Sequence, residues 1–505
     1  MGRWRRSLPT SNKTERYVMR KIISLLVIFS IVGIQPAESA TKTIKCSSGT
    51  VKVKSGNTYK CIKKVTAPVI KAQVFTDVCE RDNNVPQEWA EYQEFALRTF
   101  GCARPYRFVT KTLPNIKPKN ETVNDQRVSA EVCKIKHGPR SGQIAFADFW
   151  DYKIDLSKEV NIQIIPIEFS DFPSNASPEK DYGKYFKYIK DAYYNLSDGR
   201  VKMNVSVPDN YFKLNKTAKS YSTGKTFQVH PGTIWEWVDM DMFRLVGDIT
   251  STVDPSIDFS NTTLNILVVP PTTNESYIAH RWTPDVYSSE KTIKSNYFIP
   301  PNSMINRKSW NGVEPFLHVH ELQHAMNKAD DHQGDTEEDV YTQNAGTGSW
   351  GIMSRLLTDF LVWDKWITNM IDDSQVICVD PNKNSTNWIK PASYFGQYEK
   401  MIVVPISPTN VLVMESVRSA GFNFKLPAKQ QGVLVYAVDT TNTKHMHGID
   451  VLRTYEDSRG PNRDGEFFLW NAPITVGEKI TYKNYEISVT ESGEFGDVVS
   501  VKVIK

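Results

Sequence analysis

Several features that would reveal a protein's class are missing from this chain of 505 residues. No dense block of Lys or Arg accompanies the net charge of +4, so we do not expect a nucleic-acid-binding surface. No long low-complexity tract and no internal repeat stands out. With 40% hydrophobic and 23% charged residues, the composition predicts a globular protein, and the length allows about two to four domains.

A long membrane-spanning run is also missing. The apolar stretch at residues 22–34 follows two basic residues and precedes a group of small residues, and it is too short to cross a bilayer comfortably. Residues 1–40 are therefore predicted to be an export signal, with Met19 as an alternative start that gives a conventional length. We expect a secreted or cell-surface-associated protein with no stable membrane span in the mature chain.

Cys-x-x-Cys pairs are absent, so zinc ligation by cysteine is not expected. All six cysteines follow the expected signal, and an even number in an exported chain favours disulfides. Cys46 and Cys61 flank a Gly/Lys/Ser-rich stretch, so we expect them to staple a hairpin. The other four allow three pairings, among which the sequence does not choose: Cys79, Cys102, Cys133 and Cys378.

Changes in composition and in hydrophobic periodicity along the chain predict four regions after the signal. Turn residues between apolar runs mark β structure, helical spacing marks residues 87–100, and the Pro/Asn/Lys-rich residues 110–128 are expected to be an exposed linker. The predicted regions are a small Cys-bracketed β module at 41–66 with strands at 43–46 and 58–63, an N-terminal cap or propeptide at 67–145, an α/β domain at 146–375 and an antiparallel β-sandwich at 376–505.

Strand and helix patterns alternate in the α/β domain and give way to short strands after it. Apolar runs bounded by turns predict strands, and an apolar face at positions three and four apart predicts helices. Strands are expected at 160–169, 201–207 and 264–269, and helices at 182–196 and 361–371 with Trp363 and Trp366 as core anchors. In the sandwich, strands are expected at 401–405, 410–417, 432–439, 466–470 and 485–490.

The stretch that carries chemistry is His320-Glu321-x-x-His324. Residues four apart share one face of a helix, so both imidazoles can point at one metal ion, and two imidazoles make half of a zinc site. Glu321 is rotated by about 100° from His320, which puts it beside the metal, where it can take a proton from metal-bound water. His318 faces away and is expected to be a surface or supporting residue.

A catalytic zinc site needs a third protein ligand and an open position for water. Asp330 follows His324 by six residues, as the third ligand does in related motifs, and Asn327 can adopt the left-handed turn that brings the chain back. We therefore expect His320, His324 and Asp330 to bind Zn²⁺. Other candidates for the third position are Asp331, His332, Glu337 and Glu338.

Two further patterns lie downstream of the motif. A Gly-rich approach leads to Met353, which predicts a tight turn with an apolar floor beneath the metal. An acidic cluster could hold a structural Ca²⁺, although a solvated acidic loop explains it equally well. The cluster consists of Asp330, Asp331, Asp335, Glu337, Glu338 and Asp339.

Taken together, these segments resemble the immune-inhibitor-A-type secreted metallopeptidases over about residues 158–505. This chain has Asn327-Lys328-Ala329-Asp330 where that family usually reads Gly-Leu-Pro-Asp. The resemblance implies a multidomain α+β fold, with a metzincin-like α/β zinc-peptidase core at 146–375 and a C-terminal antiparallel β-sandwich. Besides the zinc motif, the matching segments are residues 167–173, 193–199, 350–354, 360–366, 413–416 and 432–436.

The expected function is that of a secreted zinc endopeptidase acting on proteins or peptides, with Glu321 as the general base. One alternative is a non-catalytic exported or cell-surface binding protein built on a peptidase scaffold. Another is a zinc hydrolase of a different bond, because the motif fixes the metal and the base but not the substrate. The sequence does not indicate an oligomeric state.

Overall fold

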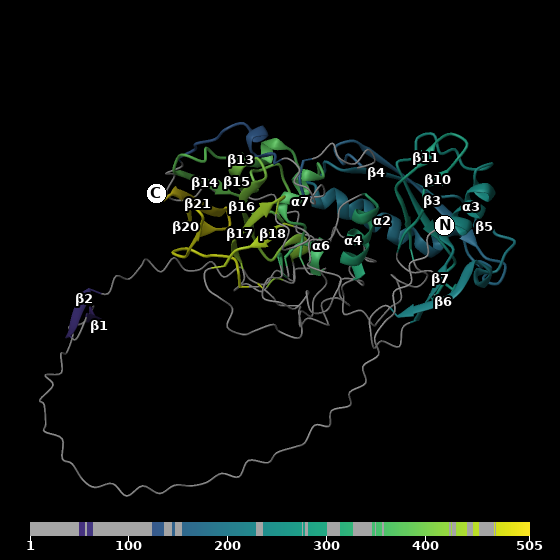
Figure 1. The fold of residues 1–505 in the computed structure, drawn as a ribbon, viewed down its shortest axis with the longest axis horizontal. Helices are drawn as coiled ribbons and strands as arrows, with labels where there is room; N and C mark the ends of the chain where they lie inside the picture. The colour runs from purple at the N-terminus through teal and green to yellow at the C-terminus, as the bar shows by residue number, and fades with distance from the viewer. Residues whose placement is uncertain are drawn as a thin grey trace, which may run out of the picture. The chain divides into compact units, whose positions relative to one another are not determined.

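A computed structural model gives the fold of the chain in two separate compact units, residues 1–69 and 70–505 (Figure 1). The expected export signal and the helical pattern at 87–100 lie outside the residues that the structure describes. Those residues are 50–55, 58–63, 124–135, 144–146, 154–228, 236–274, 276–277, 281–299, 314–326, 346–348, 350–355, 358–423, 426, 431–441, 448–453, 469 and 471–504.

The first unit contains a β-hairpin. Strand β1 (Thr50–Ser55) pairs antiparallel with β2 (Thr58–Lys63), in a register that sets Lys52 opposite Cys61. The strand expected at 58–63 is confirmed, and its partner begins at Thr50. Cys46, the expected partner of Cys61, lies outside the described residues, as does the strand expected at 43–46.

A six-stranded, mostly parallel sheet organises the first half of the second unit. Its strand order is β4-β3-β8-β12-β9, with β5 paired to β3, and only β9 runs antiparallel to its neighbour β12. The strands expected at 160–169, 201–207 and 264–269 are confirmed. The six strands are β3 (Glu159–Glu168), β4 (Lys202–Ser206), β5 (Phe212–Lys213), β8 (Leu264–Val268), β9 (Arg281–Trp282) and β12 (Asn296–Phe298).

Helices cover both faces of this sheet, which explains why apolar residues of its central strands are buried on both sides. In β3, Ile162 and Ile164 face the core that contains helices α2 (Pro178–Leu196) and α4 (Glu314–Ala325). Ile165 and Ile167 face the opposite core. Helix α3 (Met242–Val253) contributes its apolar side to that second core.

Helix α2 follows the amphipathic pattern expected from the sequence. Ser177 caps its N-terminus by accepting a hydrogen bond from the Lys180 amide, and Pro178 occupies the first turn. Four residues on one side of the helix are all buried: Tyr185, Ile189, Ala192 and Tyr193. The helix ends where Asp198 and Gly199 adopt positive φ angles of 55° and 79°.

Two further sheets form the C-terminal part and pack face to face. A five-stranded sheet has the order β13-β15-β16-β17-β18, and a four-stranded sheet has the order β14-β21-β20-β19. Of the strands expected here, only 466–470 lies largely outside the described residues; the other four are confirmed. The strands are β13 (Val376–Cys378), β14 (Ser385–Ile389), β15 (Met401–Ser407), β16 (Asn410–Val417), β17 (Gly432–Asp439), β18 (Ile449–Val451), β19 (Lys479–Tyr482), β20 (Tyr485–Gly493) and β21 (Gly496–Val503).

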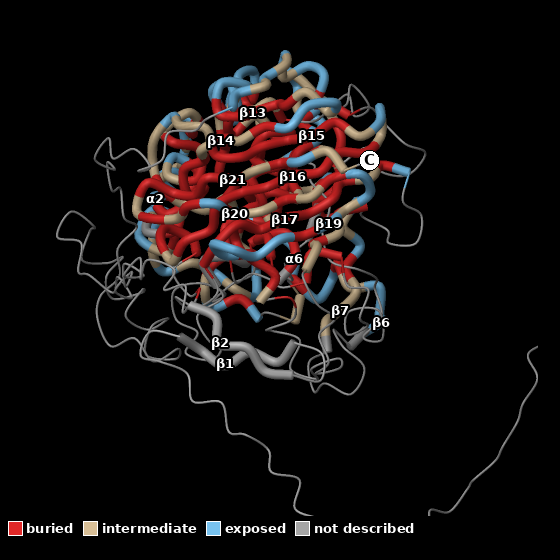
Figure 2. Tube along the Cα trace, turned by 90° about the vertical axis from the view of Figure 1, so that its left-hand side faces the viewer, coloured by how far each residue is buried: buried red, intermediate tan, exposed pale blue. Residues whose placement is uncertain are grey.

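The five-stranded sheet departs from the expected antiparallel pattern at one pair, because β13 runs parallel to β15. It is also buried on both faces, as the uninterrupted burial along β16 and most of β17 indicates (Figure 2). Leu412 and Met414 face the four-stranded sheet, whereas Val411 and Val413 face a separate core. A one-sided strand would alternate apolar and polar residues, which these strands do not.

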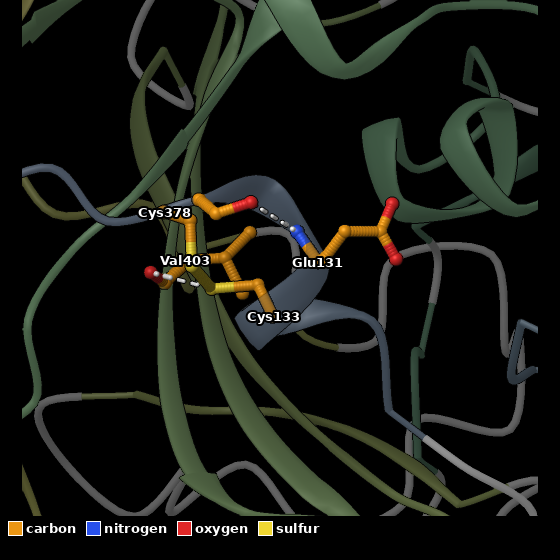
Figure 3. The surroundings of a disulfide bond; sticks show 5 residues. Glu131, Cys133, Cys378 and Val403 are labelled. Atoms are coloured by element: carbon orange, nitrogen blue, oxygen red, sulfur yellow. Dashed lines mark hydrogen bonds between the residues drawn. A yellow bond between two sulfur atoms is a disulfide. The ribbon is translucent and has the colours of Figure 1, made fainter.

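The separate core is closed by a segment from far upstream, residues 124–135 and 144–146. The Val128 amide donates to the Cys378 carbonyl, and Cys133 forms a disulfide with Cys378 across 245 residues of sequence (Figure 3). This is one of the pairings that the sequence left open. Residues 124–128 are largely exposed, as expected, but they are not a free linker, because Asn124 bridges to Thr386 of β14 and Arg127 to Val379 at the end of β13.

Helix α7 (Val362–Ile367) lies over the same core. Its Trp363 and Trp366 are buried, as expected, and both rings pack edge-on against Phe146, at 5.6 and 4.4 Å between centroids. The helix is shorter than the predicted 361–371, because Asn369 adopts a left-handed conformation with φ of 62°. The last turn of α7 contains the basic residue Lys365.

Short elements complete the description, and the described residues form a mixed α/β structure with several sheets, some of them antiparallel. No helix among them is long and apolar enough to cross a membrane. The short elements are η1 (Ala130–Cys133), η2 (Ala218–Tyr221), β6 (Ser222–Gln228), β7 (Glu236–Met240), β10 (Val286–Tyr287), β11 (Thr292–Ile293), α6 (Ile352–Arg355), η3 (Asp373–Gln375) and η4 (Gly421–Asn423).

Candidate metal centre

Helix α4 carries the His-Glu-x-x-His motif. One side of the helix packs in the core, and the motif residues lie on the other side. Val319, Leu322 and Ala325 are buried in the core beneath the sheet. His320, Glu321 and His324 lie at the intervening positions, so they point away from that apolar side. His320 is 8% exposed, whereas Glu321 and His324 are half-buried, which leaves the motif at the edge of the core.

The two histidine rings converge. The Nε2 atoms of His320 and His324 are 3.0 Å apart, and the rings meet edge to face with 4.6 Å between their centroids. At that distance the two nitrogens cannot both bear a hydrogen pointing at the other. A single proton, or a single metal ion, held between them would satisfy both.

A hydrogen bond at the other ring nitrogen of His320 orients its imidazole. Its Nδ1 lies 2.9 Å from the carbonyl oxygen of Ile352, the residue before Met353. A carbonyl oxygen only accepts hydrogen bonds, so Nδ1 carries the proton and Nε2 keeps its lone pair for another partner. This is the arrangement that metal-binding histidines use, with the second ring nitrogen tied to an oxygen atom.

The pair fits a zinc ion in its donor chemistry and spacing. Two nitrogen ligands at about 2.0–2.1 Å from one tetrahedral Zn²⁺ stand about 3.3 Å apart. The observed 3.0 Å between the two Nε2 atoms is within a few tenths of an ångström of that separation. The distance between the two nitrogens is therefore compatible with their sharing one ion.

The methionine expected beneath the motif is in the core with α4. Met353, in α6, is fully buried in the same cluster as Val319 and Leu322. The segment that carries it is held tightly: the Gly351 amide donates to the Thr358 hydroxyl, and the Ser354 hydroxyl donates to the Gly348 carbonyl. The sequence indicated this turn but not the role of its Ile352 carbonyl.

Helix α2 supports α4 through tyrosines. The Tyr193 hydroxyl contacts the Val319 carbonyl oxygen at 3.2 Å and the Gln323 side-chain oxygen at 3.1 Å. Tyr185 packs edge-on against His318, with 5.2 Å between ring centroids. His318 is fully buried, so of the two roles expected for it the surface role is wrong and the supporting role is consistent with its packing.

Glu321 lies close enough to Tyr297 of β12 for its charge to be felt there. Burial raises the pKa of Tyr297 well above its usual range, with nearby tyrosines and the negative charge of Glu321 adding to the effect. Tyr297 therefore keeps its proton at physiological pH. It was not singled out from the sequence, since a tyrosine in an apolar strand carries no signal of this kind.

The remaining predicted ligands cannot be located. Asp330 lies outside the described residues, as do its competitors Asp331, His332, Glu337 and Glu338 and the rest of the acidic cluster proposed for Ca²⁺. Among the residues that are described, no three His, Cys, Asp or Glu side chains gather closely enough to hold a metal ion.

Comparison with known proteins adds no relative to this picture. No family model matches the chain, and no curated protein matches it.

Proposed function

We propose that the protein is a zinc-dependent endopeptidase. The observation that carries the proposal is the convergence of two imidazole nitrogens, 3.0 Å apart, on a helix whose first histidine is tied through Nδ1 to the Ile352 carbonyl. His320 and His324 would hold the ion, and Asp330 remains the proposed third ligand. Together with the buried Met353, this arrangement suits a metal hydrolase better than a chance pair of surface histidines.

Zinc bound at such a site lowers the pKa of water and polarises a carbonyl group. Glu321, one position from His320 on the half-buried side of α4, then acts as general base and takes a proton from the attacking water. The same carboxyl group passes the proton to the leaving amine when the peptide bond breaks.

The sheet edge suggests how a substrate would be held. Strand β9 is the last strand of the six-stranded sheet in the described part of the chain, runs antiparallel to β12, and lies against α4. An extended peptide that adds to such an edge pairs its backbone with the strand and does not depend on one side chain. We therefore propose protein or peptide substrates of broad sequence range.

The finer fold and the cellular location belong to the same proposal. The mostly parallel sheet with one antiparallel edge strand supports a metzincin-like core, and the two packed sheets after residue 376 support a β-sandwich. The disulfide between Cys133 and Cys378 supports export, because disulfides persist in oxidising compartments. The resemblance to secreted metallopeptidases points the same way.

The deciding experiment combines metal analysis with a protease assay. The purified protein should contain one zinc per chain and cleave casein, and a chelator should abolish the cleavage. Glu321→Gln keeps the shape of the side chain but removes the base, so we expect zinc to stay bound and cleavage to fall by about 10²–10⁴-fold. Glu179→Gln, on the exposed first turn of α2, is the control and should behave as wild type.

Three outcomes would redirect the proposal. Undiminished casein cleavage by Glu321→Gln would remove the mechanism. A protein that binds no zinc and cleaves nothing would favour the non-catalytic binding protein. Zinc binding with chelator-sensitive hydrolysis of esters but not of casein or peptides would favour a hydrolase of another bond.

A further inference from the structure

The C-terminal sheets send a loop into the core beneath the motif helix. The connection between β16 and β17 contains Phe422, which is buried in the cluster that also holds Val319, Leu322 and Met353. A residue after position 376 thus packs in the core that supports α4. The packing connects the two halves of the second unit at the candidate metal centre.

A chain of hydrogen bonds runs through the same place. The Asn423 side-chain oxygen accepts from the Asp359 amide at 2.8 Å. The Asp359 carbonyl in turn accepts from the Ile352 amide at 3.1 Å. The Ile352 carbonyl then meets His320 Nδ1 at 2.9 Å. Three contacts therefore connect a side chain of the C-terminal sheets to the imidazole.

The middle of this chain is rigid and dry. The Asp359 carboxylate accepts from the Phe360 amide and from the Lys365 ammonium, both at 2.7 Å. The side chains of Asp359 and Lys365 are only 5% and 2% exposed, and Asn423 is buried as well. With no water to take over a lost hydrogen bond, each group in the chain depends on its protein partner.

The short helix η4, which presents Asn423, begins at a glycine in a left-handed conformation. Gly421 has a φ of 55°, and a Cβ built there would come within 3.0 Å of the Ser393 carbonyl oxygen. Only glycine fits this close approach without displacing backbone. The loop therefore holds Phe422 and Asn423 in one arrangement against the segment that carries Ile352.

We propose that Asn423 is a positioning residue for His320: by holding Asp359, it sets the Ile352 carbonyl that orients the imidazole and keeps the His320 proton on Nδ1. The proposal rests on the proposed function, since a ring held in this way matters most when Nε2 binds a metal. Asn423 itself is not expected to touch metal or substrate. The C-terminal sheets are thereby a part of the metal centre rather than an appended module.

Replacing Asn423 with leucine tests the proposal. Leucine has a similar volume and no acceptor, so the Asp359 amide loses its partner and the Ile352 carbonyl is free to shift. We expect the zinc affinity, measured by competition with a chromophoric chelator, to fall about tenfold, the lower end of the usual loss when support behind a metal ligand is removed. Asn423→Ser, which is a smaller change, serves if the leucine variant does not fold.

A second measurement reports on the ring without metal or activity. In chelator-treated protein labelled with ¹⁵N-histidine, His320 should carry its proton on Nδ1. In Asn423→Leu and Asn423→Ser the signal should move towards the Nε2-protonated form, which is unlike the response to a general loss of stability. His320→Gln identifies the resonance.

The control is Asn410→Leu. Asn410 is equally buried, starts the same strand β16, and donates to the Asp439 carboxylate at 2.8 Å. It loses a comparable hydrogen bond but has no link to Ile352, so the melting temperature should fall while zinc affinity and the His320 signal stay as in wild type.

The outcomes separate the two proposals. If wild type binds zinc and both Asn423 variants bind it as tightly as Asn410→Leu, with His320 unchanged, the positioning role is refuted and the metal site stands. If wild type binds no zinc, the proposed function is refuted, and the ¹⁵N signal alone decides whether Asn423 orients the ring.

Discussion

The two halves of the large unit solve the same problem, polar groups in a dry core, in different ways. In the half built on the parallel sheet, several buried polar groups are neutral, such as the Tyr182 hydroxyl, which donates to the Val269 carbonyl, and the Asn265 amide, which donates to the Asn296 side-chain oxygen. The core around the C-terminal sheets also buries charges. Its ion pairs are Arg418 with Asp497, Lys400 with Asp198 from the end of α2, and Asp359 with Lys365 of α7.

The difference has a physical consequence. Burial raises the pKa of Tyr182, Tyr185 and Tyr193, so these phenols stay neutral throughout the physiological range. Burial also raises the pKa of the Glu415 carboxyl, to about 7, within that range. The pH dependence of stability that Glu415 supplies should therefore arise in the C-terminal half, whereas the buried tyrosines of the other half should supply none.

The largest effect is expected from the covalent link of the C-terminal half. For a loop of 245 residues, the chain-entropy account of a disulfide gives about 5 kcal/mol of stabilisation. Cys133→Ala/Cys378→Ala should lower the free energy of unfolding by up to that amount, measured by urea titration with tryptophan fluorescence. Trp363 and Trp366 lie in the core that the disulfide closes, so they report on this half. An unchanged midpoint would show that residues 124–135 and 144–146 are held by packing and hydrogen bonds alone.

Removing one member of a buried ion pair should come next. Lys365→Met leaves the Asp359 carboxylate buried without its partner, which typically costs about 3–5 kcal/mol. Asp359→Asn/Lys365→Met removes both charges and should recover much of the loss in the same urea titration. If the single variant is as stable as wild type, the ion pair is not what distinguishes this half.

The next prediction concerns how the free energy of unfolding depends on pH through the Glu415 carboxyl. Its ordinary pKa is 4.5 and burial raises the pKa to about 7 in the folded protein, where the Val362 amide and the Tyr436 hydroxyl contact it. The folded state therefore binds a proton that the unfolded chain has released between these values. Stability is highest below pH 4.5 and falls by about 3 kcal/mol as pH rises to 7, after which this group adds no further loss.

Glu415→Gln tests that slope. Glutamine mimics the protonated carboxyl and does not titrate, so urea midpoints between pH 4.5 and 7 should lose the part of the slope that Glu415 supplies. The same variant should leave the response to pH above 7.5 unaltered. A wild-type slope that persists in the variant would assign the effect to another group.

The smallest effect is expected in the parallel half. Tyr193→Phe removes the hydroxyl contacts to Val319 and Gln323 and should cost about 1 kcal/mol. Because the phenol is neutral at every pH tested, the loss should be the same at pH 5 and pH 8. A pH-dependent loss would contradict the contrast between the two halves.

Much of the fold could be predicted because residues close together in the sequence determine it. Strands β3, β8, β16 and β17 are continuous apolar runs, and α2 shows its inner face by spacing alone. The convergence of His320 and His324 follows from the helical repeat. These features need no knowledge of what lies opposite them, so sequence reasoning reaches them.

The misses are contacts between distant parts of the chain. Residues 124–128 look like a linker by composition, and only their pairing with β13 and β14 makes them part of a sheet. The parallel pairing of β13 with β15 depends on the connection between them, not on their residues. Asn423 carries no local signal, because its role is set by Asp359, which is remote in sequence.

The position of Asn423 also orders events in time. Synthesis at about 5–20 residues per second makes the loop that bears it roughly 5–20 s after His320. During that interval the growing chain displays the whole histidine motif without the side chain that holds Asp359 and, through it, Ile352. In the proposed peptidase, the support behind His320 would therefore be completed only after residue 423 has been made.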